Sequence, residues 1–373
     1  MLKCNNMKIL LLGGDEKVLE SGGASQQRMA SYGSLAEQIH ILIFSGKQLP
    51  LQQIGNVFIY SSTGNWRLAH FFKACFLAKK IIIRNHIDVI STQDPFESAL
   101  IGWWQKKTRR VKLNVQVHGD FFSEDYWKKQ RWFNFVRYHE AAFVLKKADS
   151  VRVVSERIKK SLVNKFKVPA KKIIVAPIYS DFSGFNKEPP QQKSGQFVFL
   201  TVSRFTKEKN LPMALRAFAR LRKNDKEAVL RIAGEGPERK NLENLAKKLR
   251  VQERVQFLGW LDKEKLAAQY GGADCFLLPS DFEGWGLAAL EVAFFGLAIV
   301  MTNVGICGEI LRPGSDVLSV APRDEGGFTA AMQRVLDDEA LRANLGRNAK
   351  LALSGLPTRG QTMELYKKAW FIV

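Results

Sequence analysis

Short apolar runs alternate with longer amphipathic segments along the first half of the chain. Runs of strand length, rich in Ile, Leu and Val, predict strands at Lys8–Gly13, Ile39–Phe44, Val57–Tyr60, Asp88–Ser91, Lys112–His118, Ser150–Ser155 and Lys172–Ala176. Apolar residues at helical spacing predict helices at Phe71–Arg84, Phe96–Lys107 and Trp132–Lys147. Strands that alternate with helices in this way are typical of a parallel sheet covered by helices on both faces.

The second half of the chain has the same pattern. Strands are predicted at Phe197–Val202, Val229–Ala233, Val255–Leu258, Cys275–Leu278, Leu297–Met301 and Val317–Val320. Helices are predicted at Leu211–Arg222, at Glu238–Leu249 and, after Pro357, at Thr362–Phe371. We therefore predict an α/β protein with two tandem Rossmann-like domains and a ligand cleft between the carboxyl ends of their sheets.

A polar segment divides the two series of strands. Ser180–Gly195 contains Pro189-Pro190 and few apolar positions, which is typical of a linker. We predict an N-terminal domain over residues 1–185, a linker over 186–195 and a C-terminal domain over 196–356. The remaining residues, 357–373, are expected to carry a C-terminal helix that can pack back on the N-terminal domain.

The cysteines and the apolar runs limit the class of protein. Cys4, Cys75, Cys275 and Cys307 lie far apart without a CxxC pair, which argues against a disulfide framework or a zinc site. No apolar run reaches the roughly 18 residues needed to span a bilayer, and the residues before Met7 lack a signal-peptide core. We therefore expect a cytoplasmic protein.

Positive charge is concentrated in the first half. The chain has a net charge of +21, of which residues 1–185 carry +15 and residues 186–373 carry +6. A basic surface of this size favours an anionic partner: nucleic acid, an anionic membrane surface or a phosphorylated substrate.

The segment Pro279–Glu291, PSDFEGWGLAALE, follows a predicted strand and passes through two glycines into a helical pattern. Free N–H groups at such a helix start suit a phosphate, and Gly284 and Gly286 allow a ligand to approach the backbone. Glu283 and Glu291 stand eight positions apart, so one carboxylate can meet a sugar and the other a ribose. The alternative is that Glu283 is a helix cap and Glu291 a buried, paired carboxylate.

Two further loops follow predicted strands in the second half. In Val202–Asn210, Arg204 and Lys209 can converge on a diphosphate, although basic residues in a surface loop are usually only solvated. Ala233–Pro237 is a turn into a helix, and lining a nucleotide pocket is the alternative to a purely structural turn.

Taken together, these elements resemble the family 4 (group 1) glycosyltransferases of the GT-B fold. The resemblance runs through the second half in the order SRFTKEKN, GEGP, FLG, LLPSDFEGWGLAALEV and VGICGEIL. It implies a retaining transferase that uses a nucleoside diphosphate sugar without a metal or other cofactor. The sequence departs from the family pattern at Ala288, where Pro is frequent, and at Asn210, where Gly is frequent.

The resemblance also assigns roles to residues of the donor site. Arg204 and Lys209 would hold the diphosphate, and Gly286 and Leu287 would donate backbone N–H groups. Glu283 would hold the sugar and Glu291 the ribose. Gly234 and Leu258, in the GEGP and FLG segments, would line the nucleotide pocket.

The first half carries the candidate acceptor side. Gly22 and Gly23 open a helical pattern; a plain turn is one interpretation, and in the family a similar loop lies under the donor phosphates beside the acceptor. His118 ends a predicted strand before Gly119, and by the same resemblance it faces the transferred sugar. Asp120 is expected either to orient the acceptor or to cap the next segment.

A retaining transferase must replace the leaving diphosphate on the face from which it departs. A covalent route needs a carboxylate at the sugar, and the sequence places neither Glu283 nor Asp120 there. In the family, the leaving phosphate takes the acceptor proton. Arg204 and Lys209 would then stabilise the charge that develops on the phosphate.

Aromatic and basic residues alternate in two segments of the first half, WWQKKTRR from Trp103 and YWKKQRWF from Tyr126. Such clusters suit a lipid headgroup interface, whereas the alternative is that the rings are core and the cations solvated. The first interpretation predicts a peripheral protein on the inner face of the cell membrane with a lipid-linked saccharide acceptor. Two other functions remain open, a sugar-nucleotide epimerase of the same fold and a nucleic-acid-binding protein, although no nucleic-acid recognition module is recognisable.

Overall fold

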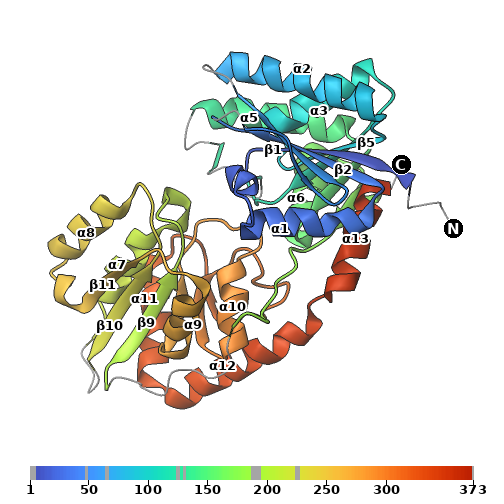
Figure 1. Cartoon of the computed structure of the whole chain (residues 1–373). Helices are drawn as coiled ribbons and strands as arrows, with labels where there is room; N and C mark the ends of the chain where they lie inside the picture. The colour runs from blue at the N-terminus through green and yellow to red at the C-terminus, as the bar shows by residue number, and fades with distance from the viewer. Residues whose placement is uncertain are drawn as a thin grey trace. The chain divides into compact units, whose positions relative to one another are not determined.

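The computed structural model describes residues 6–46, 49–63, 67–122, 127–128, 132–185, 195–222 and 227–371 (Figure 1). The chain divides into two compact units. Unit 1 comprises Met1–Ile178 and Pro357–Val373, and unit 2 comprises Tyr179–Leu356. Among the described residues, no helix has the length and apolar character needed to cross a membrane.

Within the described residues, unit 1 is built on an eight-stranded sheet of order β3-β4-β2-β1-β5-β6-β7-β8. Its strands are β1 (Lys8–Gly13), β2 (Gln38–Phe44), β3 (Gln52–Ile54), β4 (Val57–Ser62), β5 (Val89–Thr92), β6 (Lys112–Val117), β7 (Ser150–Val153) and β8 (Ile173–Val175). All neighbours pair in parallel except β3 and β4, which are antiparallel. The central strands β1, β5 and β6 are buried on both faces because helices cover both, and β6 carries the buried polar residues Asn114 and Gln116.

Among the described residues, the main helices of unit 1 are α1 (Ala24–Ser31), α2 (Arg67–Asn85), α3 (Glu97–Thr108), α5 (Trp132–Lys147), α6 (Glu156–Phe166) and α13 (Arg359–Phe371), and the short helix η3 (Tyr32–Leu35) follows α1. Helix α2 packs on α3, and α3 packs on α5, which forms one layer. Figure 1 shows this layer on one side of the sheet and α1 and α13 on the other.

The C-terminal helix α13 packs on β7 and β8 of unit 1. It begins with a reciprocal cap, in which Thr358 N donates to Gln361 Oε1 (2.8 Å) and Gln361 N donates to Thr358 Oγ1 (3.3 Å). Its last turn accepts two buried hydrogen bonds from the sheet, because Asn114 Nδ2 and Ser150 Oγ both donate to the carbonyl of Ala369. These contacts join residues that are 255 and 219 positions apart in the sequence.

Within the described residues, unit 2 is a six-stranded parallel sheet of order β11-β10-β9-β12-β13-β14. Its strands are β9 (Phe197–Val202), β10 (Ala228–Ala233), β11 (Val255–Gly259), β12 (Cys275–Leu278), β13 (Ala298–Thr302) and β14 (Leu318–Val320). Its helices are α7 (Leu211–Ala219), α8 (Arg239–Lys248), α9 (Lys263–Gly271), α10 (Leu287–Phe295), α11 (Glu325–Asp337) and α12 (Glu339–Ala352), with the short helix η5 (Lys207–Lys209).

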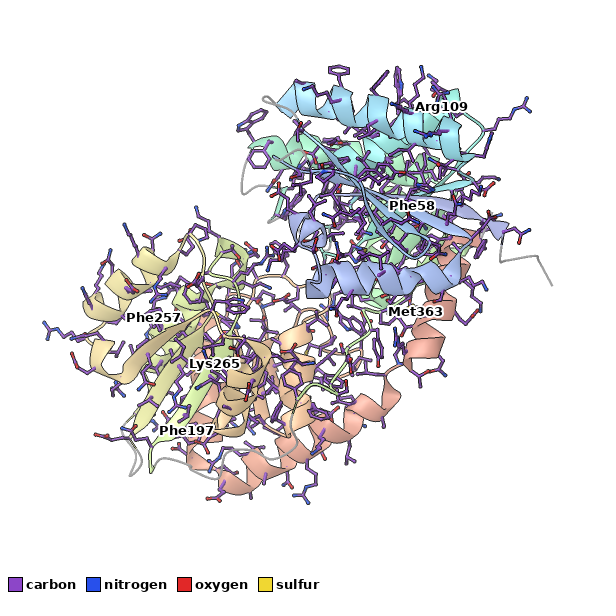
Figure 2. All side chains as sticks on the ribbon, viewed as in Figure 1. Phe58, Arg109, Phe197, Phe257, Lys265 and Met363 are labelled. Carbon is purple, nitrogen blue, oxygen red and sulfur yellow. The ribbon has the colours of Figure 1, made fainter. Side chains whose placement is uncertain are left out.

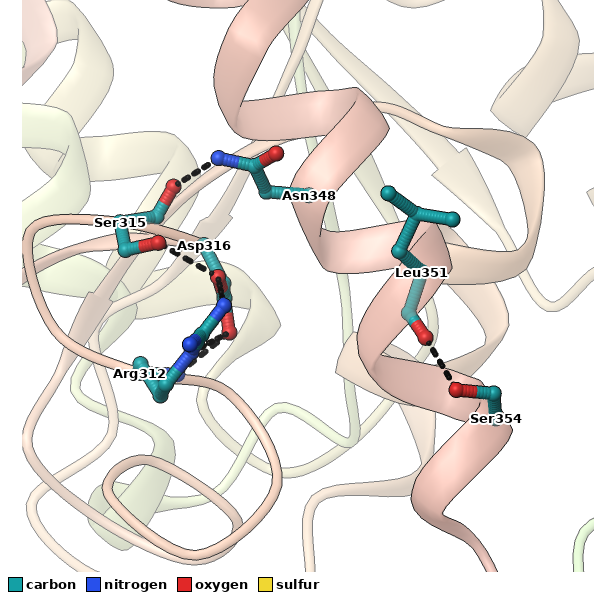
Figure 3. Close-up of polar contacts among 6 residues, drawn as sticks. All are labelled: Arg312, Ser315, Asp316, Asn348, Leu351 and Ser354. Carbon is teal, nitrogen blue, oxygen red and sulfur yellow. Dashed lines mark hydrogen bonds and ion pairs between the residues drawn. The ribbon is translucent and has the colours of Figure 1, made fainter.

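Polar contacts fasten the loop before β14 to helix α12 (Figure 3). The fully buried carboxylate of Asp316 accepts hydrogen bonds from the backbone N–H of Arg312 (2.9 Å) and from Ser315 Oγ (2.9 Å). Asn348 of α12 donates to the carbonyl of Ser315 (3.0 Å). The loop is thereby held in place although it lies outside regular structure.

The structure differs from the predicted domain boundary. Residues 179–185, assigned to the N-terminal domain, belong to unit 2. The reason is packing: the ring of Phe182 stacks on Phe294 (5.0 Å between centroids), and Phe185 contacts Tyr270 and Phe295. Residues 186–194, most of the predicted linker, lie outside the described residues. The helix predicted at Leu211–Arg222 ends at Ala219, and the antiparallel strand β3 was not predicted.

Candidate functional site

Three loops meet at the carboxyl edge of the sheet of unit 2. They follow the neighbouring parallel strands β9, β10 and β11, whose carboxyl ends share one edge. Backbone hydrogen bonds join them: Phe205 N donates to the carbonyl of Glu235 (2.8 Å), and Gly234 N donates to that of Gly259 (2.7 Å). The structure thus brings the segments SRFTKEKN, GEGP and FLG into one cluster.

Gly234 serves the packing of these loops. It has a φ of +127°, and a Cβ on it would lie 1.9 Å from the carbonyl oxygen of Ser203. No other residue fits this contact. The packing of the loops therefore explains the glycine at this position without reference to a ligand. Leu258, the other residue expected to line a nucleotide pocket, is half-buried on β11.

The segment after β12 turns into helix α10 as the sequence predicts. Gly286 is the N-cap residue, with a φ of +93° that favours glycine, and the helix begins at Leu287. Leu287 is exposed. The first turn of α10, with its free backbone N–H groups, therefore comes directly after the half-buried loop that carries Glu283.

Lys209 and Glu283 form an ion pair in this region. Lys209 Nζ lies 2.6 Å from Glu283 Oε1, and Ser280 Oγ donates to the same oxygen at 2.8 Å. The exposed fractions of the two side chains are 17% and 10%. In an ion pair that is largely withdrawn from water, each charge compensates the other. Removal of either partner would leave an uncompensated buried charge. Lys209 and Glu283 were predicted separately and lie 74 positions apart, and the structure joins them in one ion pair.

Asn210 shapes the turn that presents Lys209. It adopts a left-handed conformation with φ +44° and ψ +38° as the cap of α7. Asn tolerates this conformation better than most residues, which accounts for its presence where the family often has Gly. Its side chain also donates to Asp281 Oδ1 (3.0 Å), an oxygen that Arg323 Nε approaches to 3.3 Å. Asn210 thus links the loop of Lys209 to the loop of Glu283.

Arg204 and Glu291 have different surroundings. The Arg204 side chain is exposed, and within the described residues it makes no hydrogen bond or ion pair. Glu291 is half-buried on α10 and accepts a hydrogen bond from the hydroxyl of Tyr270 (2.7 Å), at the end of α9. Burial raises the pKa of the Glu291 carboxyl above its ordinary value. Within the part of the chain that the structure describes, Glu291 is thus paired with α9, and no shared partner joins it to Glu283.

His118 lies at the carboxyl edge of the sheet of unit 1, directly after β6. Its Nε2 is 3.0 Å from Gln116 Oε1, which also accepts a hydrogen bond from Arg152 Nη1 (2.7 Å). An amide oxygen only accepts, so His118 Nε2 carries the proton and Nδ1 has the free lone pair. Burial, with the positive charges of Arg152 and Arg28, lowers the pKa of His118 to about 3. His118 is therefore a neutral imidazole at physiological pH.

The other acceptor-side residues also lie in unit 1. Gly22 has a φ of +75°, and its N–H donates to Gln26 Oε1 (2.9 Å), while Gly23 is the N-cap of α1. The turn is closed by a side chain of its own helix, which agrees with the interpretation as a plain turn. Asp120 is buried, two positions after His118. No hydrogen bond or ion pair found among the described residues joins Gly22 or Gly23 to His118.

Comparison with known proteins identifies the chain. Residues 183–352 match the family described as "Glycosyl transferases group 1", and residues 34–178 match "Glycosyltransferase Family 4". The chain belongs to the family 4, group 1 glycosyltransferases. The two matches cover most of the chain and divide it close to the boundary between units 1 and 2.

Relatives of this glycosyltransferase agree with the assignment. It is 39% identical over 162 residues to the glycogen synthase of Mycobacterium tuberculosis, which is 43% of this chain and 39% of that protein. The match thus spans about two fifths of that relative's length. The solved structure of sucrose-phosphate synthase from Thermosynechococcus elongatus has a TM-score of 0.81 and 20% identity, covering 97% of this chain and 99% of that one. HepE of Anabaena, solved with UDP and glucose, has a TM-score of 0.73 and 16% identity and covers 97% and 98%. The fold of the glycosyltransferase is GT-B.

Several residues that support these sites were not predicted as such. Ser280 and Asp281 precede Glu283 in the PSDFEG segment, so their position in the motif was a usable signal. Tyr270, Arg323 and Gln116 lie far from the motifs or inside a strand, and nothing in their local sequence marks them. Their contacts with Glu291, Asp281 and His118 become visible only in the folded chain.

Proposed function

We propose that this glycosyltransferase is a retaining, metal-independent enzyme of the hexosyltransferase type that uses a nucleoside diphosphate sugar. The acceptor is a saccharide or lipid-linked saccharide in cell-surface glycan biosynthesis. The observation that carries the proposal is the Lys209–Glu283 pair at the edge where three loops of unit 2 meet. The presence of UDP and glucose in the HepE structure supports a nucleotide-linked sugar as donor.

The donor diphosphate is proposed to bind Arg204 and Lys209. The guanidinium of Arg204 is exposed and, among the described residues, makes no hydrogen bond or ion pair, which suits a forked contact with phosphate oxygens. Lys209 is paired with Glu283 before the donor arrives. As the diphosphate takes over Lys209, Glu283 becomes free to accept hydrogen bonds from the sugar hydroxyls. Glu283 is thus the counter-ion of Lys209 until the donor diphosphate replaces it.

The remaining donor contacts are proposed to come from the start of α10 and from residues near it. The backbone N–H groups of Gly286 and Leu287 lie at the start of α10, where the helix dipole favours a phosphate. Glu291 is proposed to bind the ribose with one carboxylate oxygen while Tyr270 holds the other. Gly234 and Leu258 are proposed to border the nucleotide.

The transfer step breaks the bond between the sugar C1 and the diphosphate oxygen and forms a bond between C1 and the acceptor oxygen on the same face. The acceptor hydroxyl gives its proton to the leaving phosphate. Arg204 and Lys209 stabilise the negative charge that develops there, so positive charge is supplied without a metal. In unit 1, His118 is proposed to face the transferred sugar as a neutral imidazole, and Asp120, Gly22 and Gly23 to face the acceptor.

The proposal is tested first with the donor. A panel of nucleoside diphosphate sugars is screened for thermal stabilisation, because a ligand that binds only the folded state raises the unfolding temperature. Donors that bind are then incubated with saccharide and lipid-linked acceptors in EDTA, and the anomeric configuration of the product is read by NMR. We expect a glycoside with the configuration of the donor.

Three outcomes would contradict parts of this proposal. Activity that is lost in EDTA and restored by magnesium or manganese would refute metal independence. An inverted product would refute retention. Release of an isomeric sugar nucleotide without any acceptor would identify an epimerase, and salt-sensitive binding of oligonucleotides without turnover of any sugar nucleotide would favour a nucleic-acid-binding protein.

A further inference from the structure

Exposed apolar side chains gather on the layer formed by α2, α3 and α5. Among the described residues, eight of the thirteen large hydrophobic side chains that stand exposed lie on these three helices. They are Phe72, Phe76 and Ile83 of α2, Trp104 of α3, and Trp132, Phe135, Val136 and Phe143 of α5. We refer to these eight side chains as the apolar face. A cluster of this kind on the outside of a folded unit marks an interaction surface.

The apolar face is regular rather than scattered. On α2, Phe72, Phe76 and Ile83 are spaced by four and seven positions, which places them on one side of the helix. The rings of Phe72 and Phe76 are 67% and 69% exposed, and that of Trp132 on α5 is 82% exposed. Opposite residues such as Ala74 and Ala78 are buried against the sheet, so the exposed rings point away from the core.

Basic side chains stand at one end of the same layer. Near the C-terminal ends of the three helices, the exposed cations are Lys79, Lys80, Arg84, Lys107, Lys146 and Lys147. Each helix leads from one parallel strand to the next, so the three run in the same direction and their C-terminal ends share one side of unit 1. Figure 2 labels the nearby Arg109 on this layer. We refer to these six cations as the basic end.

The layer offers almost no negative charge to offset the cations. In the sequence of the three helices the acidic residues are Glu97 and Glu140. Glu97 is engaged by Arg137, whose Nη2 lies 2.6 Å from Glu97 Oε1, and Glu140 is half-buried. The partner of this surface must therefore be anionic. A second copy of the same face is unfavourable, because two basic ends would repel each other.

We propose that the apolar face and the basic end together dock the protein on the surface of an anionic phospholipid bilayer. The inference rests on the proposed function with a lipid-linked acceptor, and it assigns a surface to the peripheral location that the sequence predicts. Protruding aromatic rings fit the headgroup region, where amphipathic side chains bury, and the lysines and arginines meet lipid phosphates. The N-terminal ends of α3 and α5 lie at the carboxyl edge of the sheet, the edge that carries His118. The apolar side chains in the N-terminal halves of α2 and α5 thus stand nearer than the basic end to the proposed acceptor side, whereas Ile83, Trp104 and Phe143 lie beside the basic end.

The tryptophans of the two aromatic–basic segments differ from one another in the structure. Trp104 and Trp132 are exposed and belong to the apolar face. Trp127 is buried and stacks on Phe96 (5.4 Å between centroids), so the interpretation of the rings as core holds for Trp127. Trp103 is half-buried against Phe143. Helix α2, which the sequence did not single out, supplies the most exposed phenylalanines.

The test is co-sedimentation of the full chain with vesicles of phosphatidylglycerol and phosphatidylcholine, compared with vesicles of phosphatidylcholine alone. We expect binding to the anionic vesicles, release in high salt, and little binding to the neutral ones. The variants F72S/F76S and K79Q/K80Q are each expected to lower the partition coefficient by about tenfold or more. Quenching of tryptophan fluorescence by brominated anionic lipid should fall in W132F.

Matched controls come from unit 2. W260S removes an exposed aromatic ring, and K247Q/K248Q removes two exposed lysines from α8. Both controls should bind anionic vesicles within about twofold of the unchanged protein. Equal losses in the unit 2 variants, or no binding of the unchanged protein, would overturn the inference. So would self-association that F72S/F76S abolishes, since the partner would then be a second copy. The assay needs no donor, and transfer to a soluble acceptor remains measurable in each variant, so failure here is distinguishable from failure of the proposed function.

Discussion

Lys209 Nζ lies 2.6 Å from Glu283 Oε1, and both side chains are largely buried. Removing one partner leaves the other as a buried charge, whereas removing both does not. We expect K209Q and E283Q each to lower the free energy of unfolding by about 1–3 kcal/mol, and the double variant to lose clearly less than their sum. Chemical denaturation of the three variants measures the coupling. Additive losses would show that the two residues do not stabilise each other.

The same pair predicts an unusual split between binding and turnover. E283Q frees Lys209 from its counter-charge, so the affinity for a bare nucleoside diphosphate should stay the same or rise. Turnover with the matched sugar nucleotide should fall by about a hundredfold, because the neutral amide replaces the carboxylate proposed to hold the sugar. Calorimetric titration and a transfer assay give the two readings. A parallel loss in both would place Glu283 at the phosphates instead of the sugar.

Glu291 and Tyr270 test the ribose assignment. E291A is expected to weaken the sugar nucleotide and the bare nucleoside diphosphate equally, by about tenfold, because both contain the ribose. Y270F leaves the carboxylate in place and removes only the hydroxyl that holds it, so its effect should be at most about threefold. If E291A changed neither affinity, Glu291 would be the buried, paired carboxylate that its contact with Tyr270 also allows.

His118 gives a dependence on pH with a defined sign. Its pKa is about 3 in the folded chain and 6.5 ordinarily, so the unfolded chain binds a proton first as the pH falls. The free energy of unfolding should therefore decrease from about pH 6.5 downward, and H118N should show a shallower decrease. Glu140 has a pKa raised to about 7 mainly by burial, so it changes the free energy of unfolding in the opposite direction as the pH falls. It is present in both the unchanged protein and H118N and does not affect their comparison. Equal slopes would contradict the neutral state of His118.

Gln116 is predicted to be a positioning residue for His118. Its Oε1 accepts hydrogen bonds from both His118 and Arg152, so Q116L leaves two buried donors unpaired. We expect Q116L to lower kcat while donor affinity is unchanged. Q116E keeps an acceptor at this position and should recover much of kcat, but its charge would raise the pKa of His118 and add an acid limb to the pH–rate profile. An unchanged profile in Q116E would mean that Gln116 does not act through His118.

Regular structure was largely predictable because its signals are local. The strands at Lys8–Gly13 and Cys275–Leu278 and the helix at Trp132–Lys147 have the predicted bounds. Each has an uninterrupted apolar or helical pattern that ends at turn or charged residues. Strand β3 was missed because Gln52–Ile54 is short and largely exposed, so it lacks the apolar alternation of a strand.

Long-range packing was not predictable from local patterns. Phe182 and Phe185 lie in a segment with the composition of a linker, and only their contacts with Phe294 and Tyr270 assign them to unit 2. In the same way, the motifs indicated Lys209 and Glu283 separately, but their pairing depends on two loops meeting across the sheet edge. Burial of Trp127 likewise depends on Phe96, the N-cap residue of α3, which is distant in the sequence.

The loops at the carboxyl edge of unit 2 are proposed to hold the diphosphate of a sugar nucleotide through Arg204 and Lys209. Lys207 provides a matched control, because it is an exposed cation of the same loop, on η5. The measurement is calorimetric titration of UDP, and of the other nucleoside diphosphates, into the unchanged protein and into R204Q, K209Q and K207Q in EDTA. We predict one binding site, a loss of affinity of about tenfold or more in R204Q and in K209Q, and a change below about threefold in K207Q. Equal affinity in all four proteins, or binding only when a divalent metal is added, would contradict the account.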